Sequence, residues 1–341
     1  MRYYDVVIIG AGPAGLACAE KLAKTDKKVL LLEQNKIIGP KVCAGGLLIR
    51  GSDYPDLPDK LLEYKYKRAI FHTPFNKTII KLNKDFICTI DRKNLGQWQL
   101  TKLKKTNVTI KTKSRVTEIR KNHVIINNSE KIKFDYLVGA DGSTSIVRKY
   151  LGLKTNDLGI SIQYIIPTKK YKNLEIFYDS KLFYLWYAWI FPHRNYVSIG
   201  CACDPRFLSS KKLRKNFDIW LKNNKIDVSK GEYQSHPINC DYKGYRFRNI
   251  FLVGDAAGLA SGLTGEGIYQ AAISGEEVAK SIINKNYVSK KMDKLIKMKK
   301  RHNKILHLVE KSWLFREIEY ELMALLLKSS LINKKIINFI S

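Results

Sequence analysis

The stretch that most constrains the fold is a glycine-rich turn between an apolar run and a helical segment. Residues 4–9 read YDVVII, which is typical of a buried parallel strand, and GAGPAG follows at residues 10–15. A segment with helical spacing then leads to a second apolar run, KVLLLE, at residues 28–33. A strand, a turn, a helix and a strand in about 30 residues form a βαβ unit, which predicts an α/β fold.

The same unit carries the residues that an adenine dinucleotide requires. Gly10 lets the chain turn tightly, Gly12 lets the backbone approach a pyrophosphate, and Gly15 lets the helix pack closely on the strand. The N-terminus of the following helix offers free N–H groups to the phosphates. Glu33 ends the second strand, where a carboxylate can bind the ribose hydroxyls.

Length and composition limit the class of protein. A chain of 341 residues with 45% hydrophobic residues predicts a globular protein with room for two domains. No apolar run reaches the ~18–20 residues of a membrane span, and MRYYDVVIIG enters a strand without a signal-peptide pattern, so we expect a cytoplasmic protein. The cysteines form no CxxC pair, and we expect free thiols at Cys18, Cys43, Cys88, Cys201, Cys203 and Cys240.

The charge is strongly positive, with 61 Lys and Arg against 31 Asp and Glu and a net charge of +30. Three interpretations are open: a solvated surface that reflects a compositional bias, an anionic membrane surface, or nucleic acid. Nucleic acid is the least favoured, because no nucleic-acid-binding module is visible. Residues 289–341 are Lys-rich with apolar residues at helical spacing. They predict either a helix pair packed on the body or a basic amphipathic surface that contacts a bilayer or a lipid substrate.

The α/β pattern occurs at both ends of the chain and a strand-rich, aromatic block lies between them. Helices are expected at residues 92–105, 208–223 and about 266–284. This order predicts a discontinuous nucleotide-binding domain interrupted by a sheet domain. The expected domains are a nucleotide-binding domain at 1–65, 92–158 and 241–288, a β-sheet substrate domain at 66–91 and 159–240, and a helical basic C-terminal region at 289–341.

Two further segments end a strand with Gly and Asp: YLVGADGSTSIVRK at 136–149 and IFLVGDAAGLASGLTGEGIYQAAISG at 250–275. Together with GAGPAG they resemble the flavoprotein family that includes p-hydroxybenzoate hydroxylase and the geranylgeranyl reductases. The resemblance covers roughly residues 1–285. It implies a Rossmann-type FAD-binding domain of the glutathione reductase-like, p-hydroxybenzoate hydroxylase type, with an inserted, mostly antiparallel β-sheet substrate domain and a helical C-terminal tail outside the resemblance.

The resemblance also implies positions for FAD. Asp255 would bind the ribitol–pyrophosphate region, the Asp141–Gly142 pair would lie near the pyrophosphate, and Arg92 would contact the phosphates. Gly265 and Gly267 would let the backbone approach the flavin ring, whose anionic reduced form a helix N-terminus stabilises. The full set of implied FAD contacts is Gly10, Gly12, Ala14, Gly15, Glu33, Gln34, Cys43, Ala44, Gly45, Arg92, Val116, Asp141, Gly142, Gly254, Asp255, Leu263, Gly265, Glu266, Gly267 and Ile268.

Two short stretches point to the geranylgeranyl reductases within that family. YAWIFP at 187–192 matches their YxWxFP pattern, although the longer form of the pattern has a proline where this chain has Tyr184. Strand alternation puts Tyr187, Trp189 and Phe191 on one face, which with Pro192 would bind a prenyl chain.

The second stretch, GPKVCAGGLL at 39–48, looks like the Cys- and Gly-rich loop of the same group. Gly45 and Gly46 are expected where the backbone approaches another group closely. The resemblance implies catalytic roles for Cys43, Tyr187 and Trp189. Cys43 and Tyr187 are the candidate proton donors, and a nearby Lys41 would favour a thiolate at Cys43 instead.

The expected function is an FAD-dependent reductase of isoprenoid carbon–carbon double bonds in a prenyl lipid, prenyl alcohol or quinone. The chain has no second dinucleotide fingerprint, so electrons would come from NAD(P)H bound transiently or from a redox partner such as ferredoxin. One alternative is a flavin-dependent monooxygenase or halogenase on the same fold, since YAWIFP is close to the WxWxIP pattern of the halogenases. Another is a non-catalytic protein that binds flavin or lipid. No metal site is expected.

Overall fold

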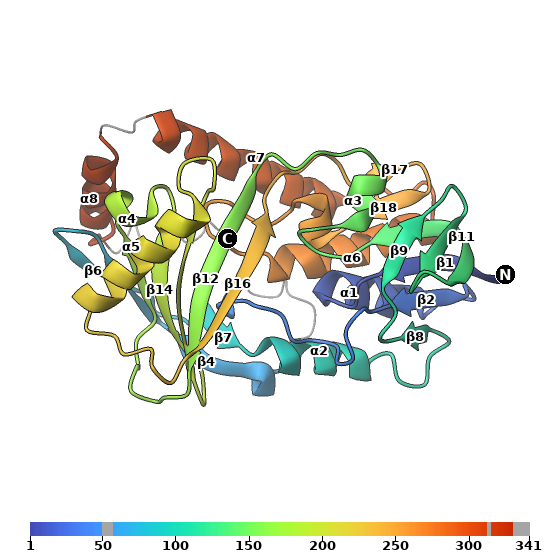
Figure 1. Cartoon of the computed structure of the whole chain (residues 1–341), viewed down its shortest axis with the longest axis horizontal. Coiled ribbons are helices and arrows are strands. Elements are labelled where there is room, and N and C mark those ends of the chain that lie inside the picture. Colours follow the sequence, from blue (N-terminus) through green and yellow to red (C-terminus); the bar gives the residue numbers. More distant parts are fainter. Residues whose placement is uncertain (50–56, 312–314, 330–341) are drawn as a thin grey trace.

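Two large β-sheets lie side by side along the long axis of the molecule (Figure 1). This arrangement comes from a computed structural model, which describes residues 1–49, 57–311 and 315–329. The N-terminal βαβ unit lies at one end of the molecule and the C-terminal helices reach the other end.

The eight-stranded sheet is built on the βαβ unit that the sequence predicts. Strand β1 pairs in parallel with β2 on one side and with β11 on the other, and β18 and β8 extend the parallel order. The apolar runs Val6–Ile9 and Val29–Leu32 are buried. The elements of this region are β1 (Arg2–Ile9), α1 (Pro13–Leu22), β2 (Val29–Leu32), α2 (Arg92–Thr101), β8 (Thr109–Lys111), β9 (Val116–Ile119), β10 (His123–Ile126), β11 (Glu130–Gly139), α3 (Ile146–Tyr150), β17 (Arg246–Phe247), β18 (Ile250–Leu252) and α6 (Ile268–Ile283).

Helix α1 lies close to both the strand before it and helix α6, and glycines make both approaches possible. A Cβ on Gly15 would stand 1.9 Å from the carbonyl oxygen of Gly10, which agrees with the packing role expected for the third glycine of the motif. A Cβ on Gly275 in α6 would stand 2.0 Å from the carbonyl oxygen of Ala14. These close contacts fix the N-terminus of α1 at the carboxyl edge of the sheet.

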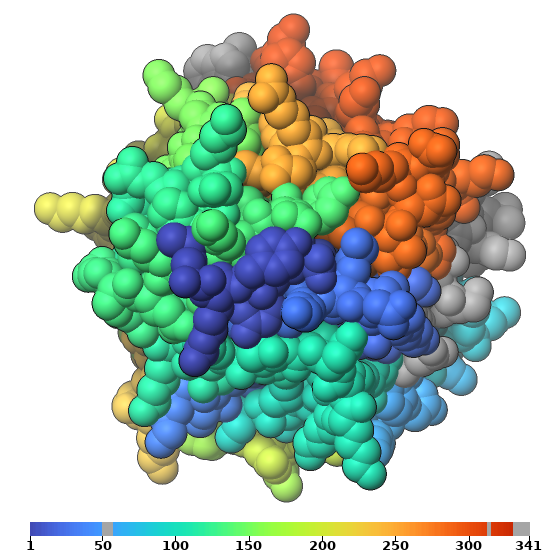
Figure 2. Space-filling model, turned by 90° about the vertical axis from the view of Figure 1, so that its right-hand side faces the viewer, coloured from blue at the N-terminus to red at the C-terminus, as the bar shows by residue number. Residues whose placement is uncertain are grey.

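This sheet is assembled from distant parts of the chain. Figure 2 shows the N-terminal residues at the centre of one face, bordered by the segment around residues 109–150 and by residues after 250. The α/β segments at the two ends of the sequence therefore meet in one sheet, as their order suggested. The domain boundaries given above stay a prediction.

The seven-stranded sheet has the order β16-β12-β15-β14-β13-β5-β6. All neighbours are antiparallel except β13 and β5, which confirms the mostly antiparallel insertion. Helix α5 covers it through Phe217 and Trp220, and YAWIFP forms strand β14 inside it. The elements are β5 (Arg68–His72), β6 (Lys77–Lys81), β12 (Leu158–Ile166), β13 (Glu175–Tyr178), α4 (Ser180–Phe183), β14 (Tyr187–Pro192), β15 (Val197–Cys203), α5 (Ser210–Asn223) and β16 (Glu232–Asn239).

A small third sheet connects these two regions, and the sequence patterns did not reveal it. It has the order β3-β7-β4, with β3 (Gly46–Leu48), β4 (Leu62–Tyr66) and β7 (Ile87–Ile90). Its apolar residues pack against Leu95 of α2 and Ile268 of α6. The glycine-rich loop that contains Cys43 runs directly into β3, so this sheet holds the loop between the two larger ones.

The tail forms two helices, α7 (Lys290–Lys311) and α8 (Arg316–Leu326), which confirms its helical prediction over these residues. The part of the predicted tail at 312–314 and 330–341 lies outside the described residues. Within the described part of the chain, no helix is both long and apolar enough to cross a bilayer. All six cysteines are free, as expected.

Candidate active site

A cavity of about 900 Å³ runs from the glycine-rich turn of the first βαβ unit, past the Cys43 loop, to the C-terminal helices. All the predicted cofactor and substrate positions line it except Gly15 and Pro192. Gly15 is used for helix packing. Pro192 does not line this cavity, since strand alternation turns it away from Tyr187, Trp189 and Phe191, and its contact with substrate stays a prediction. Its carbonyl oxygen instead accepts a hydrogen bond from Thr89 Oγ1 at 2.9 Å.

The nucleotide end of the cavity is shaped by the turn before α1. Within the described part of the chain, no atom outside the neighbouring residues lies within 4 Å of the position that a Cβ on Gly12 would take, so the backbone there is open to a ligand. Glu33 is held beside this turn, because its Oε2 accepts from the N–H of Ala11 at 3.0 Å. Its Oε1 accepts from the backbone N–H of Asn35 at 2.8 Å. The carboxylate is thereby oriented at the cavity rim, where a ribose would lie.

Arg92, the first residue of α2, provides a test of whether the residues fit FAD. Asp91 caps the helix by accepting from the N–H of Asn94 at 2.8 Å, which fixes the start of α2 at the cavity. The Nε atom of Arg92 is buried and has no hydrogen-bond partner among the residues that the structure describes. An unpaired buried guanidinium nitrogen is costly, and a phosphate oxygen is the acceptor that suits it best. Together with the open backbone at Gly12, it fits a dinucleotide pyrophosphate.

Asp255 and Lys41 form an ion pair across the cavity, and sequence reasoning did not find it. Lys41 Nζ lies 2.8 Å from Asp255 Oδ2, and Ser143 Oγ donates to the same oxygen at 3.2 Å. Burial works to raise the pKa of Asp255, but the charge and hydrogen bond of Lys41 outweigh it and hold the pKa below its ordinary value. The ammonium of Lys41 is thus directed at Asp255.

Asp141 has a structural role of its own. Its carboxylate accepts from Ser145 Oγ at 2.7 Å and from the backbone N–H of Ile146 at 2.6 Å, at the N-terminus of α3. Burial raises the pKa of Asp141, whereas these hydrogen bonds oppose the rise. The neighbouring Gly142 has a φ of +76°, and among the described residues no atom lies within 4 Å of the position that a Cβ on it would take. Of Asp141 and Gly142, the glycine is therefore the residue that leaves room for a ligand.

The Cys43 loop packs directly against strand β14. A Cβ on Gly45 would stand 2.5 Å from His193 Cε1, and a Cβ on Gly46 would stand 2.5 Å from Phe191 Cε2. The two glycines therefore allow the loop to approach a protein strand. Cys43 is half-buried, and its Sγ accepts from the N–H of Gly45 at 3.4 Å. The two stretches that suggested a geranylgeranyl reductase thus form one wall of the cavity.

His193 holds the Cys43 loop in place through a hydrogen bond to the loop backbone. Its Nε2–H donates to the carbonyl oxygen of Ala44 at 3.0 Å, and its Nδ1 contacts the carboxylate of Glu63. The side chains of both His193 and Glu63 are buried. No sequence motif marked His193, although it directly follows YAWIFP.

Tyr187 connects β14 to the loop before α6. Its hydroxyl donates to the carbonyl oxygen of Thr264 at 2.6 Å, and a Cβ on Gly265 would stand 3.0 Å from the same hydroxyl. Burial raises the pKa of Tyr187 well above its ordinary value, with smaller contributions from Tyr178, Glu266 and Cys43. The phenol is therefore protonated at neutral pH and is fixed in place.

Trp189 is oriented by a hydrogen-bonded chain that leads back to the Cys43 loop. Its Nε1–H donates to Ser198 Oγ at 3.0 Å, and Ser198 Oγ donates to Gln163 Oε1 at 3.1 Å. The amide Nε2 of Gln163 then donates to the carbonyl oxygen of Cys43 at 3.4 Å. The indole N–H is the only polar hydrogen of the Trp189 side chain, and it is used in this series of hydrogen bonds. The indole can therefore contact a ligand only through the face or edge of its ring.

Beyond Tyr187 the cavity is an apolar chamber. It is enclosed by strands of the seven-stranded sheet and, at its far end, by the C-terminal helices. The apolar chamber is lined by Ala69, Phe71, Ile80, Phe86, Ile87, Ile176, Tyr178, Trp186, Ala202, Ile238, Ile305, Met323 and Leu327. Sequence reasoning missed these residues. Alternation in β5 and β6 identifies Ala69, Phe71 and Ile80 as facing one side, but does not reveal what that side faces.

Helix α7 holds the loop between Gly258 and Gly267 in place. Its buried Lys299 donates to the carbonyl oxygen of Ala260 at 2.6 Å. Ser261 Oγ lies 2.8 Å from His302 Nδ1 and accepts from the N–H groups of Leu263 and Thr264, so it donates to the imidazole.

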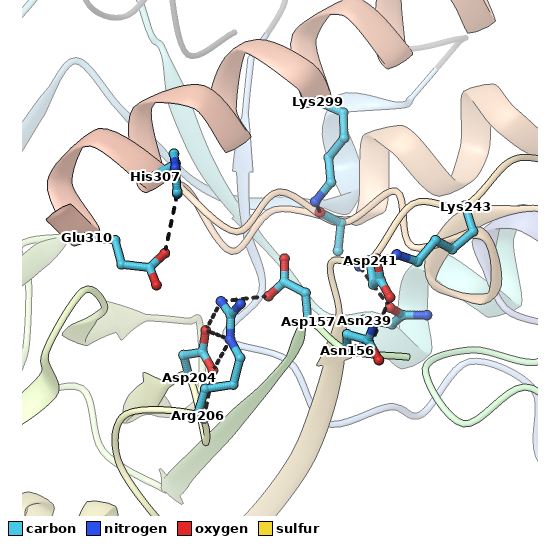
Figure 3. A network of polar contacts seen from close by, with 11 residues as sticks. Asn156, Asp157, Asp204, Arg206, Asn239, Asp241, Lys243, Lys299, His307 and Glu310 are labelled. Atoms are coloured by element: carbon cyan, nitrogen blue, oxygen red, sulfur yellow. Dashed lines mark hydrogen bonds and ion pairs between the residues drawn. The ribbon is translucent and has the colours of Figure 1, made fainter. Parts of the chain in front are cut away.

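Below α7, a polar network joins the sheets. Figure 3 shows Lys299 extending from α7 toward it. Within it, Arg206 pairs with Asp204 and lies 3.7 Å from Asp157. The C-terminal helices therefore help to fix the part of the site predicted to face the flavin ring.

Comparison with known proteins agrees with this geometry. Residues 8–80 match the model of the NAD(P)-binding Rossmann-like domain family. Digeranylgeranylglycerophospholipid reductase of Methanococcus vannielii is 30% identical over 334 residues, which cover 89% of this chain and 84% of that protein.

Two solved structures share the fold. A geranylgeranyl bacteriochlorophyll reductase-like protein of Thermoplasma acidophilum superimposes with a TM-score of 0.73 at 21% identity, covering 100% of this chain and 92% of that one. The p-nitrophenol 4-monooxygenase PnpA of Pseudomonas putida gives a TM-score of 0.74 at 15% identity, with 99% and 97% covered. With the sequence relative above, these place the fold among flavin-dependent oxidoreductases. The chain belongs to the geranylgeranyl reductase family of FAD-dependent oxidoreductases.

Proposed function

We propose that this enzyme saturates isolated carbon–carbon double bonds of an isoprenoid lipid of the geranylgeranyl type. The observation that carries the proposal is the continuity of the cavity. A polar part with Gly12, Glu33 and Arg92 and the apolar chamber belong to one cavity of about 900 Å³. The place where the two halves meet is bordered by Cys43 and Tyr187.

An isolated double bond must receive a proton at one carbon while hydride reaches the other. Reduced FAD, when bound, supplies the hydride. The protein must supply a proton and exclude water from the reacting carbons. The ring faces of Trp189 and Phe191 and the aliphatic residues of the apolar chamber support water exclusion, because they line the cavity without offering a polar group to it.

Cys43 is the better of the two candidate proton donors. The hydroxyl proton of Tyr187 is engaged by the carbonyl oxygen of Thr264, and burial holds the pKa of this phenol far above neutrality, so its release to a carbon is costly. A free thiol is intrinsically a stronger acid than a free phenol. In this proposal Tyr187 positions the Thr264–Gly265 backbone, and Cys43 delivers the proton.

Electrons are proposed to come from NAD(P)H or from a reduced ferredoxin-like partner. The Rossmann match at residues 8–80 covers the same glycine-rich turn that FAD would occupy, so it does not add a second nucleotide site. The substrate headgroup stays open between a phospholipid, a prenyl alcohol and a quinone. A shared fold with a monooxygenase keeps oxygen chemistry as the second candidate.

The test is a reoxidation experiment on the purified flavoprotein under argon. The bound flavin is first reduced with dithionite, excess reductant is removed, and a geranylgeranyl lipid is added. The proposal expects the flavin absorbance to return at a rate that rises with lipid concentration. The fully saturated phytanyl lipid is the matched control and should give no return. A flavin that stays reduced with every prenyl lipid but consumes oxygen in the presence of an aromatic substrate would favour the monooxygenase.

A further inference from the structure

Helix α8 has apolar residues on two opposite sides. The inner side packs on the body through Tyr320, Ala324 and Leu327, and Leu327 also lines the apolar chamber. The outer side exposes a stripe at helical spacing, with side chains 48% to 60% exposed. This outer α8 stripe consists of Phe315, Ile318, Leu322, Leu325 and Leu326. A surface helix with a solvated outer side would carry polar residues at these positions, so the stripe indicates a contact.

The polar side chains of α8 are used to fix it on the body, which leaves the outer α8 stripe facing outward. The carboxylate of Glu321 accepts from Thr73 Oγ1 at 2.8 Å and from the backbone N–H of Phe75 at 3.1 Å, at the tip of the β5–β6 hairpin. Thr78 Oγ1 donates to the carbonyl oxygen of Ala324 at 2.8 Å. Phe75 is itself 80% exposed, so the apolar surface continues from α8 onto the hairpin tip.

Two lysines lie beside this apolar surface. Lys181 lies 3.4 Å from Glu317 at the start of α8, and Lys328, just beyond its end, lies 3.2 Å from Asn76 Oδ1. Helix α7, which precedes α8 in the chain and runs along the upper edge of the molecule in Figure 1, has nine Lys or Arg and two acidic residues between 290 and 311. Apolar side chains bordered by cations are the pattern of a helix that lies in the interface of an anionic bilayer.

We propose that the outer α8 stripe and the tip of the β5–β6 hairpin dock on the surface of an anionic phospholipid bilayer. Each Lys or Arg near such a surface contributes about 1 kcal/mol of attraction. A second copy of this chain is the less suitable occupant, because it would bring two molecules of charge +30 together. Docking places the far end of the apolar chamber, behind Leu327, next to the hydrocarbon layer. The docking proposal rests on the proposed function only in assuming that the substrate comes from the hydrocarbon layer of the membrane.

The test is co-sedimentation of the full-length protein with vesicles that contain no prenyl lipid, so that binding is measured without turnover. The protein should co-sediment with vesicles of phosphatidylglycerol and phosphatidylcholine in equal parts, and should not co-sediment with vesicles of phosphatidylcholine alone. The double variant Leu322→Glu/Leu325→Glu should lower the partition coefficient at least about tenfold. The matched control, Ile283→Glu/Val288→Glu, changes two exposed apolar residues near the start of α7 and should bind like the wild type after correction for its added charge.

Three results would overturn the proposal. One is wild-type protein that stays in the supernatant with the anionic vesicles. Another is an equal loss of binding in the α8 variant and its control, which would show that net charge, and not the outer α8 stripe, determines vesicle binding. The third is a wild-type dimer in light scattering that the α8 variant converts to a monomer while vesicle binding is kept. That result would assign the outer α8 stripe to a second copy of the chain.

Discussion

Lys41 Nζ lies 2.8 Å from Asp255 Oδ2, so an ion pair joins the loop before Cys43 to a loop that lies 214 residues further along the chain. Both side chains are mostly buried at the edge of the nucleotide half of the cavity. The pair therefore sets the distance between the Cys43 loop and the start of the Gly254–Gly267 segment, the two backbone stretches that would border a flavin.

Replacing Lys41 should destabilise the protein even without cofactor. Lys41→Gln leaves the carboxylate of Asp255 without its cation, and we expect a loss of roughly 1–3 kcal/mol in the free energy of unfolding at pH 7, measured by urea titration of the apoprotein. Because the pair holds the folded-state pKa of Asp255 below its ordinary 3.8, its stabilisation is present above that value and disappears as pH falls through the lower folded pKa. Adding Asp255→Asn should recover part of the loss, and equal stability of Lys41→Gln and wild type would contradict this account.

His236 should make the protein acid-sensitive. Burial, with Lys41 and Arg92 nearby, lowers the pKa of His236 from 6.5 to about 4. Between these values the unfolded chain binds a proton that the folded protein does not, so stability falls as pH drops through that window. The urea midpoint should decrease less between pH 7 and 4.5 in His236→Gln than in the wild type. The same decrease in both proteins would show that His236 keeps an ordinary pKa.

We expect Gly12 to be needed for FAD binding and not for the stability of the fold. A Cβ at this position meets no atom within 4 Å and its φ of −75° suits any residue, so Gly12→Val should unfold at nearly the wild-type urea concentration but purify without yellow colour. Gly15→Ala is the contrasting variant, because its Cβ would collide with the Gly10 carbonyl and cost about 3 kcal/mol of stability. If the Gly12→Val protein is still yellow, FAD binds without a glycine here, and the prediction that the pyrophosphate lies against this turn is wrong.

Cys43 should be needed for turnover and not for the cofactor. Cys43→Ala and Cys43→Ser should keep bound FAD with an unchanged flavin spectrum, yet lose most of the prenyl-reducing rate, since both lack an acid of comparable strength. Cys88→Ala, which changes a buried thiol in β7, should keep that rate within a few-fold. Wild-type turnover in both Cys43 variants would leave the thiol with a role in shaping the cavity only.

Local patterns were enough to predict the βαβ unit, the antiparallel insertion and the helical tail. Each depends on residues close in sequence, such as the buried run Val29–Leu32 or the alternation of Tyr187, Trp189 and Phe191. The same alternation turns Pro192 away from these three residues, and Pro192 does not line the cavity. Most positions implied by the family resemblance line one cavity, although their individual roles stay predictions.

Other features were beyond the sequence because they arise from tertiary contacts. The Lys41–Asp255 pair and the His193–Glu63 contact join segments that no periodicity relates. The amphipathic pattern of α8 indicates an apolar side but cannot reveal that Leu327 lines a chamber together with strands of the seven-stranded sheet. The three-stranded sheet escaped notice because β3 has only three residues, too few for a strand pattern.

The account's central claim is that reduced FAD in this protein saturates an isoprenoid double bond. The most direct measurement incubates the anaerobically reduced flavoprotein with geranylgeranyl lipids and follows the lipid by mass spectrometry. The account predicts products that gain two hydrogens per reduced bond, in an amount that matches the flavin reoxidised. Unchanged lipid beside a fully reduced flavin, or a product that carries an added oxygen or halogen once air is admitted, would contradict it.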